Sequence, residues 1–197
     1  MNEVMTKRRA MPDAFEQTVY QQAEFDALRR MLTISEGTFS LSVATCNSPA
    51  LRDHLIAQIK REMDGIEVVR VPEKTQDIFD FVRGQILDTQ PRAVFIIDME
   101  RAVTDANSDR IVQGLNVSRE HWYTAYRCPI VFWLPDRVTS LLMTQARDLW
   151  SWVSHHFEFV SERATPATRQ RRRRNASHPS DKSHRSHADT PKNRENR

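Results

Sequence analysis

The stretch Ala93–Asp98 reads AVFIID, which is five consecutive apolar residues followed by an acidic residue. A strand that is covered by helices on both faces of a parallel sheet has this composition, because neither of its sides meets water. A second run of the same kind, PIVFWL, occupies Pro129–Leu134. These two runs predict two strands buried within a parallel sheet.

Strand and helix patterns alternate around the two buried runs. Further strands are predicted at 39–45, 66–71 and 156–160, because these segments are short and apolar and lie between helical patterns. This alternation is typical of a three-layer α/β domain with a mostly parallel sheet, here of five strands and preceded by an N-terminal helix. The helices are predicted at 12–36, 50–63 and 75–89, then through Ile111 and Tyr126 in one longer segment, then at 136–148.

The charge of the chain is unevenly distributed. Residues 163–197 contain nine Arg and two Lys against three acidic residues, a formal charge of +8, so residues 1–162 carry −5 of the chain's total of +3. The basic segment has almost no large apolar side chain, and we expect it to be disordered because it cannot bury enough surface to offset chain entropy. The predicted organisation is a ragged N-terminus at 1–11, one α/β domain at 12–162 and a disordered basic tail at 163–197.

The turn after the first predicted strand, Thr45–Leu51, lacks the residues that hold phosphate in a P-loop. A P-loop needs glycines, so that backbone N–H groups can surround phosphate oxygens, and a lysine that reaches the terminal phosphates. This turn has neither, and Pro49 removes one of the N–H donors. Ser48 and Pro49 instead predict the start of a helix, with Ser48 as its N-cap. We therefore expect the domain to bind no cofactor.

Asp98 and Glu100 follow the first buried run in the arrangement of a Walker B segment. There the Asp holds magnesium and a neighbouring Glu orients the attacking water. Because no phosphate loop lies opposite, we prefer the alternative that Asp98 ends a buried strand and caps the next turn. Trp133 and Leu134 end the other buried run, at a position where a polar residue would be needed to sense a phosphate. We expect no catalytic residue and no metal ligand, with Asp98 and Glu100 as weak candidates only.

Four short segments carry the clearest resemblance to a known family: LNVSRE at 115–120, VFWLP at 131–135, DLWSW at 148–152 and FEF at 157–159. In their order and spacing they resemble the inactive, P-loop-lacking relatives of the STAND NTPases, over about residues 15–160. Such relatives are modules of multidomain bacterial signalling and conflict proteins, often beside tetratricopeptide repeats. The resemblance implies the strand order 5-1-4-3-2 and a domain without catalytic activity.

Three functions follow as hypotheses. The first is a non-catalytic scaffold or switch module of a bacterial signalling or conflict system, with an effector or repeat protein as its partner. The second is association with nucleic acid through the tail, because arginine runs bind phosphate backbones without reading sequence. The third is a divergent NTPase that uses Asp98 and Glu100. The arginines of the second hypothesis are Arg169, Arg171, Arg172, Arg173 and Arg174.

Composition excludes several other classes. No apolar stretch approaches the roughly 20 residues that span a bilayer, and no apolar segment follows Lys7–Arg9 as in a signal peptide. Two cysteines are too few for a disulfide framework or a zinc site. Cys46 and Cys128 are predicted at opposite ends of the sheet, roughly 20 Å apart at 3.3 Å per residue, and so cannot form a bridge. A cytoplasmic location is the resulting expectation.

Overall fold

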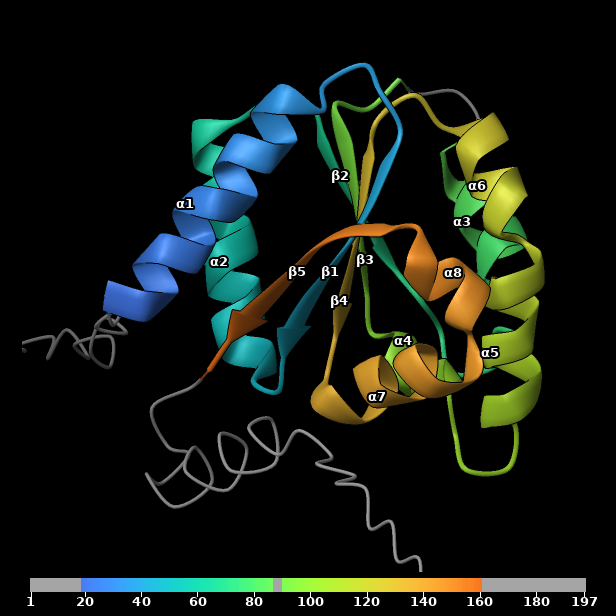
Figure 1. Cartoon of the computed structure of the whole chain (residues 1–197). Helices are drawn as coiled ribbons and strands as arrows, with labels where there is room; N and C mark the ends of the chain where they lie inside the picture. The colour runs from blue at the N-terminus through green and yellow to red at the C-terminus, as the bar shows by residue number, and fades with distance from the viewer. Residues whose placement is uncertain (1–18, 87–89, 161–197) are drawn as a thin grey trace, which may run out of the picture. The chain divides into compact units, whose positions relative to one another are not determined.

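The computed structural model describes residues 19–86 and 90–160, all of which belong to the unit Met1–Ser161 (Figure 1). The predicted ragged N-terminus and the tail with its arginine run lie outside the described residues. Helices and strands alternate as α1 (Val19–Ile34), β1 (Ser40–Cys46), α2 (Pro49–Glu62), β2 (Ile66–Arg70), α3 (Ile78–Gln85), β3 (Ala93–Ile97), α4 (Met99–Ala102), α5 (Ser108–Val117), α6 (Arg119–Ala125), β4 (Pro129–Leu134), α7 (Asp136–Gln145), α8 (Arg147–Ser151) and β5 (Val153–Phe159).

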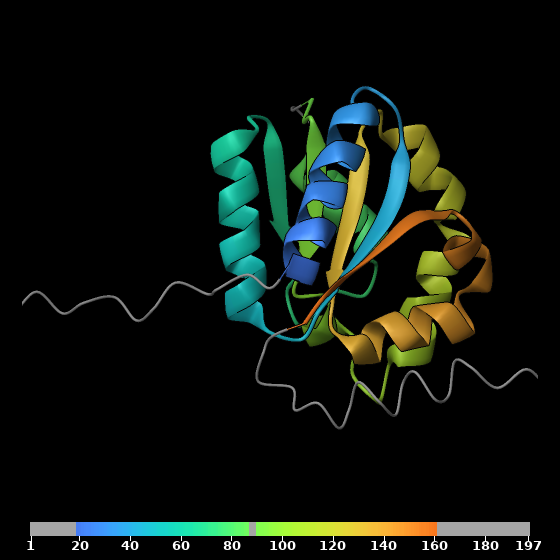
Figure 2. The same cartoon turned by 60° about the vertical axis from the view of Figure 1, so that its left-hand side comes forward.

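The five strands form one sheet in the order β2-β3-β4-β1-β5, and every neighbouring pair is parallel. Counted from the other edge this is 5-1-4-3-2, so the expected order and the α/β class are confirmed. β5 lies obliquely at the outer edge of the sheet (Figure 2), and its register with β1 shifts between Leu41 and Ser42. The carboxyl ends of all five strands consequently meet at one edge.

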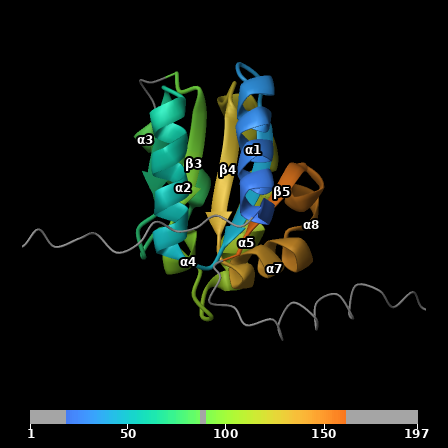
Figure 3. The ribbon, with the colours of Figure 1, turned by 90° about the vertical axis from the view of Figure 1, so that its left-hand side faces the viewer.

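Helices cover both faces of the sheet. α1 and α2 pack on one face (Figure 3), and α3, α5, α6, α7 and α8 lie on the other (Figure 1). Each face has its own cluster of buried apolar side chains, with Phe95 and Trp133 beneath α1 and α2, and Ile96 and Phe132 on the opposite side. Every residue of β3 and β4 is buried, which confirms the prediction drawn from the two apolar runs.

Two helix starts show how local hydrogen bonds set the element bounds. Ser48 caps α2 as predicted, since its hydroxyl accepts the N–H of Leu51 at 3.3 Å. α3 begins at Ile78 and not at 75, because the Asp77 side chain accepts the N–H of Asp80 at 2.9 Å and so fixes the first turn there.

The predicted long helices are each divided in two. The helix through Ile111 and Tyr126 is wrong as one element: α5 ends at Val117 and α6 begins at Arg119, with Ser118 between them at φ −78° and ψ 2°. The helix predicted at 136–148 likewise ends at Gln145, because Ala146 has a ψ of 56° that a helix does not accommodate. Apolar spacing continued across both breaks, so periodicity did not reveal them.

Two findings concern the classes of protein that the composition of the chain excludes, namely membrane-spanning and disulfide-bonded proteins. In the part of the chain that the structure describes, no helix combines the length and the apolar character that a membrane span requires. Cys46 and Cys128 are free and buried, and the prediction that they form no bridge is confirmed.

Candidate functional site: the carboxyl edge of the sheet

The carboxyl edge of the sheet is the place to look for a ligand, because ligands of open α/β sheets bind beyond the carboxyl ends of the strands. Between β1 and α2 the chain has only two residues, Asn47 and Ser48. A P-loop places several residues there, and their N–H groups wrap around phosphate. With α2 starting directly after the strand, this turn has no loop long enough to do so.

Asp98 ends β3 and is bound by two guanidinium groups. Its Oδ1 lies 2.8 Å from Nη1 of Arg52, and its Oδ2 lies 2.5 Å from Nη1 of Arg70. The Asp98 and Arg52 side chains are only 8% and 6% exposed, whereas that of Arg70 is 60% exposed. Both carboxylate oxygens of the Walker-B-like candidate are therefore occupied by cations of the chain itself.

The backbone at Asp98 is unusual. Its φ of 62° lies in the left-handed region, where among the described residues only Gly37 and Gly65 also lie. Asp98 follows β3 directly and stands at the N-cap position of α4, where its carbonyl accepts the N–H of Arg101 at 3.0 Å, but its side chain makes no capping hydrogen bond. The left-handed conformation, which Asp tolerates better than most residues, accompanies a side chain directed to Arg52 and Arg70 instead.

Arg52 is the centre of this cluster. Its Nε donates to Asp53 at 3.0 Å, and its Nη1 lies 3.8 Å from Glu100 as well as against Asp98. Burial lowers the pKa of Arg52, but the hydrogen bond and charge of Asp53, together with Asp98, outweigh burial and raise it above its ordinary value. Arg52 is thus a permanent buried cation at the first turn of α2.

Glu100, the second candidate, lies at the rim of the cluster. Its side chain is 28% exposed, with Oε1 toward Arg52 and with Oε2 buried and without a hydrogen bond among the described residues. The structure thus brings Asp98 and Glu100 together around a guanidinium. Within residues 19–86 and 90–160, no three or more His, Cys, Asp or Glu side chains are placed to hold a metal ion together.

The end of β4 carries buried apolar side chains at the position where a polar residue would be needed to sense a phosphate. Trp133 is fully buried, stacks on Phe159 with centroids 5.4 Å apart, and meets Phe95 edge-on at 5.9 Å. Just beyond it, Asn47 accepts the N–H of Asp136 at 2.8 Å and donates to its carboxylate at 3.0 Å. The turn after β1 is therefore tied to the start of α7.

A hydroxyl–imidazole group at the same edge was not predicted. Thr45 Oγ1 lies 2.8 Å from His156 Nε2 and 3.0 Å from Thr139 Oγ1. A hydroxyl beside an imidazole can begin a nucleophile–base pair. Here, however, Thr45 is 5% exposed, and its hydroxyl also contacts the hydroxyl of Thr139. The contacts of Thr45 therefore join β1, α7 and β5. Only the register of β5 on β1 could have revealed this group, because the residues are far apart in sequence.

Fold and edge together define a three-layer α/β domain with a parallel five-stranded sheet, whose carboxyl edge is bridged by its own charged side chains. No model of a known family matches the chain, and no curated protein matches it. Among solved structures the chain is similar to the Aeropyrum pernix ORC2 protein, solved as ADPNP–ADP complexes, with 11% identity and a TM-score of 0.46. The match covers 75% of this chain, which spans about half (49%) of the length of that protein. The more specific resemblance to STAND relatives stays a prediction.

Proposed function

We propose that this domain is a non-catalytic scaffold or switch module that acts through protein contacts in a bacterial signalling or conflict system. The observation that carries the proposal is the buried pair of Arg52 and Asp98, with Arg70 on the second oxygen. In this interpretation the guanidinium groups take the place of the magnesium ion that such an aspartate serves in a working NTPase.

The cost of displacement supports the proposal. A magnesium ion that bound Asp98 would have to separate it from Arg52, whose side chain is 6% exposed. Removing one partner of a buried ion pair costs about 3–5 kcal/mol, because the other charge is left without compensation. The turn before α2 has only two residues, which is shorter than the loop whose N–H groups contact phosphate in a P-loop and would offset this cost. A domain of this kind is retained for its surfaces, and an effector or repeat protein is the proposed class of partner.

Isothermal titration of the full chain with ATP and magnesium tests the proposal. We expect no heat beyond dilution and no ATP-dependent rise in melting temperature, since a ligand stabilises only what it binds. Asp98→Asn is the matched control, because Asn tolerates the left-handed backbone but lacks the charge. Micromolar binding with turnover that Asp98→Asn abolishes would establish the divergent NTPase instead.

The arginine run at 169–174 favours a second candidate, non-specific association with nucleic acid. Contacts to phosphate release counterions, so binding should fall steeply as salt rises. Deleting residues 163–197 should then abolish binding to a duplex DNA probe. A truncated chain that binds the same probe equally well would exclude the tail as the binding segment.

A further inference from the structure

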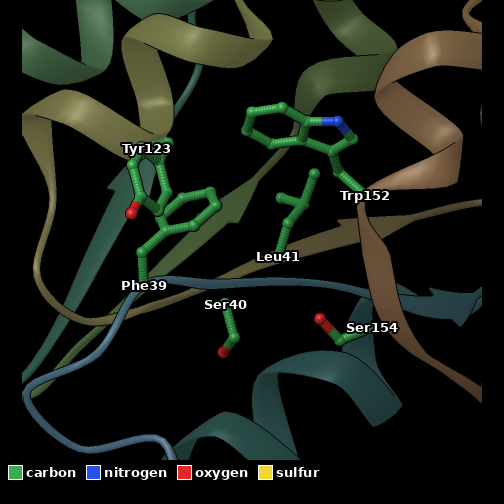
Figure 4. Close-up of a pocket in the computed structure, with 6 residues that line it drawn as sticks. All are labelled: Phe39, Ser40, Leu41, Tyr123, Trp152 and Ser154. Atoms are coloured by element: carbon green, nitrogen blue, oxygen red, sulfur yellow. The ribbon is translucent and has the colours of Figure 1, made fainter.

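At the amino end of the sheet, opposite the charged cluster, a depression of about 280 Å³ lies between the start of β1, α6 and the start of β5. We call it the β5 pocket (Figure 4). It is smaller than the roughly 300–1,000 Å³ of pockets that bind small molecules. The residues that line it are Phe39, Ser40, Leu41, Tyr123, Trp152 and Ser154.

The walls of the β5 pocket are aromatic. Phe39 meets Tyr123 edge-on with centroids 5.7 Å apart, and Tyr123 meets Trp152 edge-on at 6.2 Å. Leu41 is buried beneath these rings, while Tyr123 is 63% exposed although large and apolar in most of its surface. None of the six lining residues is charged. The pocket therefore suits one large, uncharged, apolar side chain.

The β5 pocket adjoins a strand edge that is covered over only part of its length. Glu24 of α1 accepts the N–H of Glu158 at 3.3 Å, and Gln21 of α1 donates to the carbonyl of Val160. α1 thus covers the carboxyl half of the outer edge of β5. Toward the amino end, no described helix or loop is hydrogen-bonded to the main chain of His156 or Ser154.

The side of β5 toward which each main-chain N–H and C=O group points follows from Glu158. In a parallel ladder the N–H and C=O of one residue point to one side, and those of the next residue point to the other side. Because the N–H of Glu158 faces outward, the main-chain groups of His156, two residues earlier, face outward as well. The side chain of His156, although exposed, contacts the hydroxyl of Thr45 and the ring of Trp150, with ring centroids 5.5 Å apart. A strand could therefore approach this edge without displacing that side chain.

We propose that a short extended segment of a partner protein adds to the amino half of β5 as a sixth strand and inserts one large, uncharged, apolar side chain into the β5 pocket. Such strand addition obtains affinity from main-chain hydrogen bonds and specificity from a side-chain pocket. This inference rests on the proposed function and specifies the chemistry of its partner.

The size of the surface selects this occupant. A stable interface between two globular copies involves about 20–30 residues on each partner, whereas the pocket has six lining residues and the adjoining edge is the amino half of one strand. A short peptide matches such a surface. Residues 163–197 of the chain itself have almost no large apolar side chain to fill the pocket.

The probe is a displayed library of random eight-residue peptides, selected against the full chain. We expect the recovered peptides to share one Phe, Trp, Leu or Ile among β-branched neighbours. Tyr123→Ala should weaken a recovered peptide by about tenfold or more, as for an aromatic anchor at an interface. Val117→Ala, at an exposed apolar residue outside the pocket, should leave binding unchanged.

Backbone methylation of the peptide tests strand addition without altering the domain. N-methyl groups on the peptide residues whose N–H groups face β5 should weaken binding by about tenfold or more. N-methyl groups on the intervening residues should leave binding within about twofold. Four outcomes would overturn the proposal: no shared anchor, equal binding to Tyr123→Ala, equal effects of the two sets of N-methyl groups, or occupation of the pocket by the chain itself. The last would appear as Tyr123-dependent binding of a synthetic peptide of residues 1–18 or as Tyr123-dependent self-association.

These failures are distinguishable from failure of the proposed function. A chain that binds neither peptide nor ATP would remove the β5 pocket as a docking site and leave the scaffold proposal standing. Turnover of ATP that depends on Asp98 would remove the scaffold proposal whatever the peptides do.

Discussion

Removing the guanidinium of Arg52 tests whether its pair with Asp98 holds the fold together. Arg52→Gln leaves the buried Asp98 carboxylate with Arg70, which is 60% exposed, as its remaining close cation. Breaking a buried pair costs about 3–5 kcal/mol, and the surviving contact to Arg70 places the expected loss of unfolding free energy at about 2–3 kcal/mol. Arg70→Gln removes an exposed partner and should cost no more than about 1 kcal/mol.

Urea denaturation of the full chain, followed by tryptophan fluorescence, measures these losses, since Trp122 and Trp133 are fully buried and change environment on unfolding. A cycle with Asp98→Asn isolates the pair. The double variant Arg52→Gln/Asp98→Asn should cost less than the sum of the two single variants by at least about 1 kcal/mol, as expected for residues in contact. Additive costs, or equal costs for Arg52→Gln and Arg70→Gln, would refute the reasoning.

Two further predictions concern single residues of the core and the turns. Burial raises the pKa of Cys128 from its ordinary 9.0 to about 11, so the native state keeps a proton that the unfolded chain loses above pH 9. The unfolding free energy should therefore fall as pH rises from 9 toward 11, and urea titrations at several pH values should show a smaller fall in Cys128→Ala. Gly37 and Gly65 both have left-handed φ angles, 72° and 77°, and a methyl group at Gly65 would also lie 3.1 Å from Cβ of Arg92. Alanine should cost about 1–2 kcal/mol at Gly37 from backbone strain alone and more at Gly65; equal midpoint shifts in urea would contradict the contact.

The fold was predictable because its signals are local. The run at 93–97 and its counterpart at 129–134 are buried on both faces, and strands of that composition are typical of a helix-covered parallel sheet. The strand order came from the family resemblance, because alternation alone fixes the class but not which strands are neighbours. The breaks at Ser118 and Ala146 escaped prediction, since the apolar spacing on either side of each break is compatible with one continuous helix.

The position of the candidate site was predictable from the sequence, but the side chains that surround Asp98 there were not. Strand ends mark the carboxyl edge, and Asp98 was identified there from sequence. Its partner Arg52 was not, because the residue of α2 that reaches Asp98 depends on how many residues separate β1 from the helix. With a loop of P-loop length, Arg52 would lie elsewhere. The joining of Thr45 to His156 likewise depends on the register of β5, which no pattern in the sequence encodes.

A nucleotide-dependent switch changes state because its ligand binds one conformation better than another and can leave. At this carboxyl edge the bridging charges are Arg52 and Arg70, which belong to the chain and cannot leave. Under the proposed function, two states of the domain would be distinguished by a contact elsewhere. The β5 pocket can do so, because Phe39, Tyr123 and Trp152 come from separate segments, and a side chain inserted among them would fix the spacing of β1, α6 and β5. A pure scaffold would instead bind the same peptide with no change in the protection of α6 amides from hydrogen exchange, which makes the two roles separable by one measurement.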